Sequence, residues 1–330
     1  VLKEIGFENV YVVPEQELPD GDFPTVSYPN PEAAEAFELA LKLAKEKDAD
    51  LVLATDPDAD RLGVYVKDAK TGEYHSLTGN MSGCLLAEYT ISQIKEKKGL
   101  PEDGALIKTI VTTNLADAIA KSYGIRLIEC LTGFKYIGQQ ILGFEQSGKG
   151  TYLFGFEESY GCLIGTHARD KDAVVASMLV CEMASYYKLK GMSLYDFMQS
   201  IYKKYGLYLN TLLNFGFEGA AGMKKMAEMM DSLRADGLKN IAGMDVITSS
   251  DYEASIETNL KTGEKAKITL PKSNVLAYTL EGGNSVIVRP SGTEPKIKIY
   301  ITAVGNTRDE AKTVTDKISD DMEKILGIKN

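Results

Sequence analysis

The chain has 330 residues, of which 44% are apolar and 25% charged, and its formal net charge is −10. The length predicts two or three domains. The negative charge and the lack of a Lys/Arg cluster argue against a nucleic-acid or membrane-surface partner, and no apolar run of 18 residues predicts a membrane span. With only two histidines, His75 and His167, a histidine-rich metal site is excluded.

Residues 1–75 are predicted to form an α/β domain that is incomplete at its N-terminus. The predicted elements are a last helical turn ended by Gly6, a strand after it, a helix over 30–49, and strands over 50–55 and 62–68. Asn30 is the expected N-cap of the helix, with Pro31 at the first helical position. Because the chain enters this unit halfway, we expect a fragment whose upstream part is missing.

Residues 76–206 are predicted to form a second α/β domain. Apolar periodicity predicts helices over 82–99, 114–124 and 173–190, and strands over 105–112 and 125–131 and near 151–154. This alternation of strands and helices indicates α/β sheets in the first two domains, mostly parallel.

Residues 207–330 are predicted to form a C-terminal α+β domain. The pattern predicts helices over 219–236 and 307–326, and strands over 274–280, 285–289 and 296–302. A stripe of four methionines on the first of these helices is expected to fill the core: Met223, Met226, Met229 and Met230.

Four cysteines are scattered without Cys-x-x-Cys spacing: Cys84, Cys130, Cys162 and Cys181. Three of them fall in apolar segments, so we expect reduced and mostly buried thiols rather than disulfides or a zinc site. This usage of cysteine is typical of a cytoplasmic protein.

Three aspartates, Asp56, Asp58 and Asp60, stand at alternate positions between two predicted strands. Such carboxylates can converge on one cation, and their oxygens suit Mg²⁺ or Ca²⁺. The calcium-loop pattern fails, because Arg61 stands where it needs glycine and Lys67 where it needs glutamate. We therefore expect Mg²⁺, completed by a phosphoryl oxygen, with Arg61 beside the phosphate. The alternative is a solvated turn, which Asp and Pro also favour.

A second polar segment, Gly-Phe-Glu-Glu-Ser-Tyr-Gly (155–161), follows a predicted strand. Loops at strand ends carry the binding groups of α/β proteins, and Glu157 and Ser159 could hydrogen-bond sugar hydroxyls. The alternative is a helix N-terminus with Glu in its first turn.

Positive charge is expected just before the predicted helix over 173–190. His167, Arg169 and Lys171 precede that helix, and a helix N-terminus already favours anions. The alternative is a solvated charge run.

The segment Arg-Pro-Ser-Gly-Thr-Glu-Pro, which begins at Arg289, gives the strongest phosphate signal. Arg289 offers a bidentate fork, Ser291 and Thr293 offer hydroxyls, and Gly292 lets backbone N–H groups approach an anion. The alternative is a polar hairpin turn.

These segments in this order resemble the α-D-phosphohexomutase superfamily, and in particular bacterial phosphoglucomutases and the phospho-sugar mutases that include phosphopentomutases. The resemblance covers the whole chain, but only as the last three of four family domains. Asp-Pro-Asp-Ala-Asp-Arg matches the metal loop, residues 155–161 match the sugar loop, and the Arg289 segment matches the phosphate loop. Two further stretches, residues 23–32 and 132–138, are also similar to the family.

The resemblance implies a reaction and a set of roles. A phosphoserine enzyme interconverts glucose 1-phosphate and glucose 6-phosphate through glucose 1,6-bisphosphate, with Mg²⁺ as cofactor. The implied metal ligands are Asp56, Asp58 and Asp60; the implied catalytic residues are Arg61, Lys171 and His167. The implied substrate-binding residues are Thr132, Gly133, Lys135, Glu157, Ser159, Lys171, Arg289, Ser291, Gly292 and Thr293.

The family's serine motif, Thr-Ala-Ser-His-Asn-Pro, does not occur in these 330 residues. We therefore expect this chain to be inactive alone and to need the serine domain of the same enzyme as its partner. Within the family, phosphomannomutase and phosphopentomutase remain alternatives. Outside it, a non-catalytic phosphosugar-binding module would also use such loops. The failed calcium-loop pattern and the two other ligand-like loops argue against a calcium-stabilised structural protein.

Overall fold

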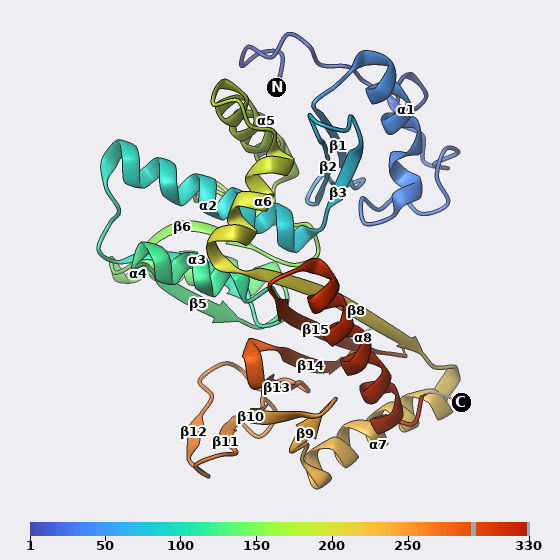
Figure 1. Cartoon of the computed structure of the whole chain (residues 1–330), viewed down its shortest axis with the longest axis vertical. Helices are drawn as coiled ribbons and strands as arrows, with labels where there is room; N and C mark the ends of the chain where they lie inside the picture. The colour runs from blue at the N-terminus through green and yellow to red at the C-terminus, as the bar shows by residue number, and fades with distance from the viewer. Residues whose placement is uncertain (292–294, 329–330) are drawn as a thin grey trace. The chain divides into compact units, whose positions relative to one another are not determined.

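The computed structural model describes residues 1–291 and 295–328 (Figure 1). Residues 1–205 form one compact unit and residues 206–330 a second. No helix in the described part of the chain is both long and apolar enough to cross a membrane.

The first unit contains a small antiparallel sheet in the order β1-β2-β3. Its strands are β1 (Leu51–Thr55), β2 (Leu62–Lys67) and β3 (Tyr74–Leu77). Helix α1 (Glu38–Lys47) and a 3-10 helix (Ala34–Phe37) pack on it, with Phe37, Ala44 and Val52 buried together. The expectation of a mostly parallel sheet is wrong here, because the short loop of aspartates turns the chain directly back on itself, and a parallel pair needs a long crossover.

Two further expectations for the N-terminal segment are wrong. The residues after Gly6 form no strand; the described chain places no strand partner beside residues 7–13, and a strand needs one for its backbone groups. A 3-10 helix (Pro14–Gln16) follows them. The Asn30 side chain accepts the N–H of Glu32 (2.8 Å) and so makes a local turn rather than a helix cap.

The second sheet of the first unit has the order β5-β4-β6-β7. Its strands are β4 (Gly104–Thr109), β5 (Arg126–Cys130), β6 (Thr151–Phe156) and β7 (Cys162–Leu163). Strands β5, β4 and β6 run parallel, as expected, and β7 is antiparallel to β6. Every residue of β4 is buried, which is typical of a central parallel strand covered on both faces.

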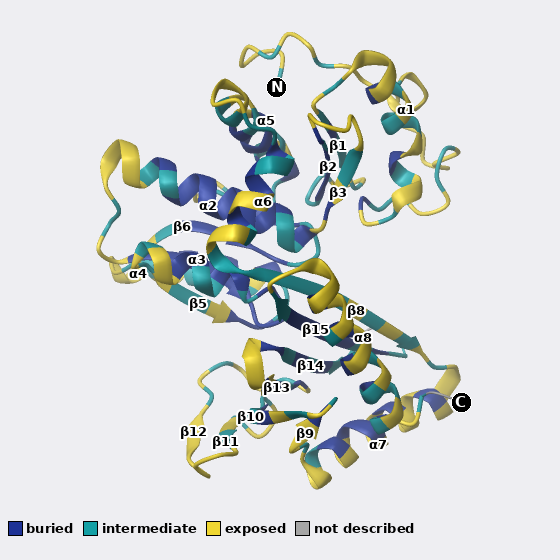
Figure 2. Ribbon diagram, in the orientation of Figure 1, coloured by how far each residue is buried: buried dark blue, intermediate teal, exposed yellow. Residues whose placement is uncertain are grey.

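Five helices accompany this sheet: α2 (Gly79–Lys98), α3 (Leu115–Tyr123), α4 (Phe134–Ser147), α5 (Ala173–Leu189) and α6 (Leu194–Tyr205). In α2 the residues from 82 to 91 are all buried (Figure 2), so this helix is surrounded by protein along most of its length. Buried residues of α4, including Phe134 and Ile137, pack against Ile107 of β4. All four cysteines are free and buried, as expected.

An open cavity of about 1740 Å³ separates the N-terminal segment from β1, α1 and α5. Several large apolar side chains of that segment are exposed, among them Tyr11, Val12 and Leu18. Among the described strands, β1 pairs with β2 alone. The sheet and the segment therefore both present surfaces that other protein could cover.

The second unit is built on one antiparallel sheet with the path β12-β11-β10-β13-β14-β15-β8, to which β9 is attached at β10. The strands are β8 (Leu207–Gly216), β9 (Asn240–Ile241), β10 (Met244–Asp251), β11 (Ile256–Asn259), β12 (Lys265–Lys267), β13 (Leu276–Leu280), β14 (Ser285–Pro290) and β15 (Lys296–Gly305). A 3-10 helix (Glu281–Gly283) joins β13 to β14, and the two helices are α7 (Gly219–Asp236) and α8 (Arg308–Ile325).

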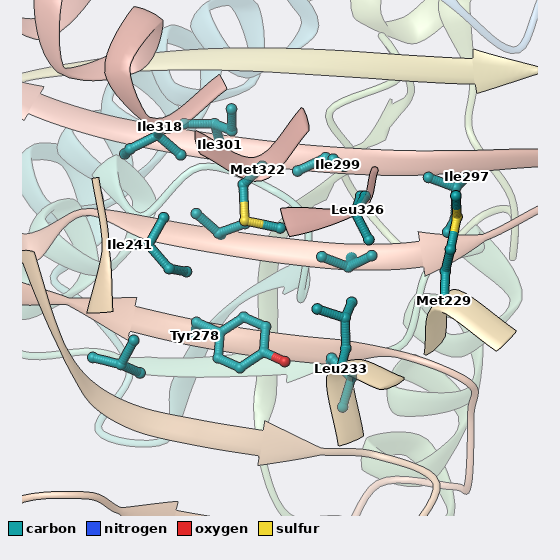
Figure 3. Close-up of a cluster of buried hydrophobic side chains, with 14 of the residues drawn as sticks. Met229, Leu233, Ile241, Tyr278, Ile297, Ile299, Ile301, Ile318, Met322 and Leu326 are labelled. Atoms are coloured by element: carbon teal, nitrogen blue, oxygen red, sulfur yellow. The ribbon is translucent and has the colours of Figure 1, made fainter. Parts of the chain in front are cut away.

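One face of this sheet and the two helices enclose a single core, which Figure 3 shows. Met229 and Leu233 of α7 and Ile318 and Met322 of α8 meet Tyr278 and the isoleucines of β15 there. Met226, Met229 and Met230 are buried, as expected, and the last two belong to this core, but Met223 is 52% exposed. It lies in the first turns of α7, outside that core.

Candidate functional site

The loop of aspartates is shaped by its own first carboxylate. It connects β1 to β2, and Asp56 Oδ1 accepts the backbone N–H groups of Asp60 (3.0 Å) and Arg61 (2.9 Å). Ala59, which lies between Asp58 and Asp60, takes a left-handed conformation with φ 54°, which is uncommon for a residue with a side chain. The loop therefore folds back tightly on Asp56.

This folding brings the three carboxylates together. Oxygens of Asp56, Asp58 and Asp60 lie within 4.8 Å of one another, with Asp58 exposed and the other two partly buried. Burial, followed by the nearby negative charges of Asp60 and Asp58, raises the pKa of Asp56 above its ordinary value. Three hard oxygen donors that repel one another in a part-buried loop fit a divalent cation such as Mg²⁺.

Two cations of the chain already approach this cluster. Arg61 Nε lies 3.7 Å from both Asp56 and Asp60, and its Nη1 lies 3.3 Å from Glu32. Lys171 Nζ lies 2.8 Å from Asp60 Oδ2. Although partial burial opposes its charge, hydrogen bonds to Asp60 and Asp170 raise the pKa of Lys171. The ammonium is therefore held charged beside the acidic loop.

Backbone contacts join this loop to the predicted sugar loop and to the first residue of α5. The Leu62 N–H donates to the Tyr160 carbonyl (3.0 Å), the Ala173 N–H donates to the Ala59 carbonyl (3.0 Å), and Arg61 and Gly161 form an antiparallel bridge. These contacts are called the clasp below. The structure thus brings together residues that lie about a hundred positions apart in sequence, which no short-range pattern indicated.

The predicted sugar loop is held from inside. Glu157 is 5% exposed, and its Oε1 accepts the Gly133 N–H at 2.9 Å. Burial raises the pKa of Glu157, while the Gly133 N–H and the positive charges of Lys171 and Arg61 act in the opposite direction. Ser159 is partly exposed, and Tyr160 takes a left-handed φ of 68°. The loop therefore carries one buried, hydrogen-bonded carboxylate, Glu157, and one partly exposed hydroxyl, Ser159.

The stretch 132–138 leads into a helix, because α4 begins at Phe134. Gly133 has a φ of 116°, where a residue with a side chain would be strained, and its N–H faces Glu157. Thr132 Oγ1 is buried and has no hydrogen-bond partner among the described residues. Lys135 is exposed and its Nζ lies 5.1 Å from the ring centroid of Tyr136.

The sequence predicted that positive charge gathers just before α5. In the structure His167, Arg169 and Lys171 each pair with a different carboxylate and do not form one anion site. His167 Nε2 lies 3.0 Å from Asp172, the N-cap of α5, and Arg169 pairs with Glu145. Only Lys171 reaches the acidic loop. Each cation has a local carboxylate partner, so His167 and Arg169 stabilise the approach to α5 instead of forming a shared positive cluster.

In the second unit, the predicted phosphate segment connects β14 to β15. Arg289 is the second-last residue of β14, and the Ser291 N–H donates to the Lys296 carbonyl at 2.7 Å. Gly292 and Thr293, also predicted to bind phosphate, lie outside the described residues. The ladder places Lys298 opposite Arg289, and two like charges across neighbouring strands favour an anion beside them. Sequence reasoning did not single out Lys298.

The architecture is that of two consecutive α/β domains followed by a C-terminal α+β domain. Three descriptions of the phosphoglucomutase/phosphomannomutase family match it in order. The α/β/α domain II matches residues 1–72, the α/β/α domain III matches residues 78–205, and the C-terminal domain matches residues 224–321. The chain belongs to this family.

Named relatives agree with this assignment. A phosphoglucomutase of Staphylococcus epidermidis is 37% identical over 322 residues, covering 97% of this chain and 57% of that protein. A probable phosphomannomutase of Haemophilus influenzae is 36% identical over 326 residues, covering 98% of this chain and 61% of that protein. The chain therefore spans somewhat more than half the length of these relatives.

Solved structures show the same fold. The open form of parafusin, a phosphoglucomutase from Paramecium, has a TM-score of 0.65 at 21% identity, over 91% of this chain and 50% of that chain. A phosphoglucomutase/phosphomannomutase family protein from Burkholderia thailandensis has a TM-score of 0.60 at 16% identity, over 93% of this chain and 53% of that chain.

Proposed function

We propose that this chain is the metal-, sugar- and phosphate-binding part of a cytoplasmic phosphoglucomutase, which interconverts glucose 1-phosphate and glucose 6-phosphate. The observation that carries the proposal is the clasp, because it joins a three-carboxylate cation site to a loop suited to sugar hydroxyls. Family membership and the relatives named phosphoglucomutase support the same reaction.

In the proposed reaction, a phosphoserine supplied by another domain exchanges its phosphoryl group with the sugar through glucose 1,6-bisphosphate. Asp56, Asp58 and Asp60 would hold Mg²⁺, which neutralises charge on a transferring phosphoryl group. Arg61 is fixed beside these carboxylates and adds a positive charge to the same place. Lys171 lies beside Asp60, where a charged amine can bind a substrate oxygen or hold a proton. His167 is a less direct participant, since its ring is bound to Asp172.

The remaining residues would bind the substrate. Glu157 and Ser159 would accept and donate hydrogen bonds to sugar hydroxyls, and Gly133 would fix the Glu157 carboxylate through its N–H. Thr132 precedes α4, and Lys135 lies in the first turn of that helix. Arg289, Ser291, Gly292 and Thr293 would hold the phosphate that does not react.

We further propose that the phosphoserine region belongs to the same enzyme and that the 330-residue chain alone is inactive. The open cavity beside β1 and the exposed apolar residues near it support the idea that additional protein packs there. Addition of glucose 1-phosphate, Mg²⁺ and a catalytic amount of glucose 1,6-bisphosphate to this chain should give no steady formation of glucose 6-phosphate. Sustained turnover by the chain alone would refute this part of the proposal.

The metal assignment is tested by the effect of Mg²⁺ on stability. A cation at one hundred times its dissociation constant stabilises the folded state by about 2.7 kcal/mol. We expect Mg²⁺ to raise the melting temperature of the unsubstituted chain and of the Asp22→Ala control, whose carboxylate lies in an exposed loop. Asp58→Ala should abolish this response. An equal Mg²⁺ response in Asp58→Ala would remove the acidic loop from the metal site.

Phosphomannomutase is the second candidate, because one relative carries that name. Phosphopentomutase activity and non-catalytic phosphosugar binding are further alternatives within the same site chemistry. A panel of glucose, mannose, ribose and deoxyribose phosphates, assayed on the full-length gene product, separates the four.

A further inference from the structure

Lys108 is the second-last residue of β4, and its side chain is completely buried. Removing an ammonium from water is expensive unless its protons all find acceptors. Its Nζ has five acceptors: Asp117 Oδ2 (2.6 Å), Asn114 Oδ1 (3.1 Å), Glu129 Oε1 (3.2 Å) and the carbonyls of Thr112 (3.3 Å) and Thr113 (3.4 Å). Most of them belong to the loop between β4 and α3, so the ammonium fixes that loop from inside.

A second element holds the same loop. The Thr113 N–H donates to Asn80 Oδ1 at 3.0 Å, and Asn80 lies in the first turn of α2. The loop from Thr109 to Thr113 is therefore tied both to a buried charge and to a neighbouring helix. It is a rigid base against which another loop can be positioned.

Two hydroxyl groups connect this base to the sugar loop. Thr109 and Thr112 are 0% and 2% exposed, and their Oγ1 atoms lie 2.8 Å apart. Each Oγ1 also lies 3.4 Å from Glu158 Oε2. Since one proton is enough for the short contact between the threonines, the other is available to the carboxylate.

Helix α2 supports the loop at a third point. A Cβ placed on Gly79 would lie 2.1 Å from the Glu158 carbonyl oxygen and 2.5 Å from the Tyr160 nitrogen. Only glycine lets the helix approach the loop backbone this closely. The two neighbouring glutamates are thus held by different elements, Glu157 by Gly133 and Glu158 by the threonine pair.

We propose that Thr109 and Thr112 are positioning residues that set the sugar selectivity of the loop from Glu157 to Tyr160. Their role is indirect: they fix Glu158, so that Glu157 and Ser159 meet the sugar hydroxyls at one geometry. This inference rests on the proposed function of that loop. Glucose and mannose phosphates differ in one hydroxyl orientation, and a site rejects the wrong epimer only when its polar groups cannot move to accommodate it.

The test compares hydroxyl removal with hydroxyl retention in the 330-residue chain. Thr109→Val/Thr112→Val removes both hydroxyls at nearly constant volume, Thr112→Val removes one, and Thr112→Ser keeps it. Thr90→Val is the matched control, because Thr90 is buried in α2 and its hydroxyl has no partner among the described residues. Melting temperatures establish that each variant is folded, and Thr112→Val is used alone if the double variant does not fold.

Two readouts separate positioning from general stability. Hydrogen exchange of the peptide covering 155–161 should be roughly tenfold faster in the double variant and unchanged in Thr112→Ser and Thr90→Val. Calorimetry with glucose 1-phosphate and mannose 1-phosphate should show the ratio of their Kd values shrinking by roughly tenfold in the double variant. Thr112→Ser should restore the ratio.

The outcomes also distinguish the two proposals. If the unsubstituted chain binds sugar phosphates and the double variant keeps both its exchange rate and its selectivity, the positioning role is overturned and the proposed function stands. If the unsubstituted chain binds none of these sugar phosphates in the presence of Mg²⁺, the sugar assignment of the loop fails, and the inference fails with it.

Discussion

Replacement of Lys108 by methionine tests whether the buried ammonium stabilises the first unit. Two opposing effects decide the result. Methionine is about as long and avoids the cost of burying a charge, so a buried ion pair can sometimes be replaced without loss. Against this, the buried Thr112 carbonyl loses its donor, and a stranded buried acceptor costs about 1–3 kcal/mol.

The surroundings of Lys108 indicate which effect is larger. Asp117 and Glu129 are 46% and 45% exposed, so water can hydrate their carboxylates when the ammonium is gone. Losing these two ion pairs therefore costs little stability. The Thr113 carbonyl still accepts the Ala116 N–H. The uncompensated cost therefore falls mainly on Thr112 and on the side chain of Asn114. We expect Lys108→Met to destabilise residues 1–205 by about 2–3 kcal/mol.

Urea unfolding followed by hydrogen-exchange mass spectrometry measures this change for each unit separately. Lys121→Met on the exposed surface of α3 is the control and should change stability by less than about 0.5 kcal/mol. Peptides from residues 206–330 should unfold as before. A Lys108→Met chain as stable as the unsubstituted one would show that desolvation outweighs the contacts and would refute the reasoning.

Three further predictions concern residues close to the candidate site. Gly83→Ala places a Cβ 2.0 Å from the Phe156 ring and should lower the free energy of unfolding in urea by about 1–3 kcal/mol. Gly143→Ala, whose Cβ would have no other atom within 4 Å, should instead stabilise α4 by about 0.5–1 kcal/mol. Equal effects of the two substitutions would contradict the close packing of α2. The side chain of Asp172, the N-cap of α5, accepts the Val175 N–H, so Asp172→Ala should lower the free energy of unfolding by about 0.5–2 kcal/mol. Asp172→Asn keeps the cap and should keep most of the stability. An Asn variant as unstable as the Ala variant would assign the loss to the broken pair with His167 instead. Because burial raises the pKa of Glu157, the folded state holds this proton more tightly than the unfolded state does. The unsubstituted chain should therefore lose stability relative to Glu157→Gln as pH rises above the ordinary value of 4.5, and a pH-independent difference between their melting temperatures would show that the carboxylate is not desolvated.

The elements with a strong periodic pattern were predicted well from sequence. Strand β4, helix α3 and helix α8 lie within a few residues of their expected bounds, because apolar spacing and terminal glycine or threonine residues mark them locally. Strands β10 to β12 were not predicted; their sequence from Met244 to Lys267 is polar and lies toward the edge of the sheet, where few side chains enter the core. Strand direction in the first sheet was also wrong, since it depends on the loop rather than on the strands.

In the candidate site, too, some residues could be identified from the sequence and others could not. Asp56, Asp58 and Asp60 were identifiable because their spacing within one loop already fixes their convergence. The approach of Lys171 to Asp60 and the support of Glu158 by Thr109 and Thr112 depend on how distant segments pack. Two residues gave a local sign of that packing: Lys108, a lysine inside a β-strand, and Gly79, a glycine at the start of a helix. Neither residue identifies its packing partner by itself.

The clasp has a consequence for how such proteins can diverge. Its bonds come from main-chain atoms of Leu62, Ala173 and their partners, so they do not depend on which side chains stand on either loop. Selection can therefore rewrite the sugar-facing residues without disturbing the register of the acidic loop. A hybrid gene that joins residues 1–77 of this chain to the following domain of a relative should keep its metal ligands aligned, provided that the partner loop turns its backbone the same way.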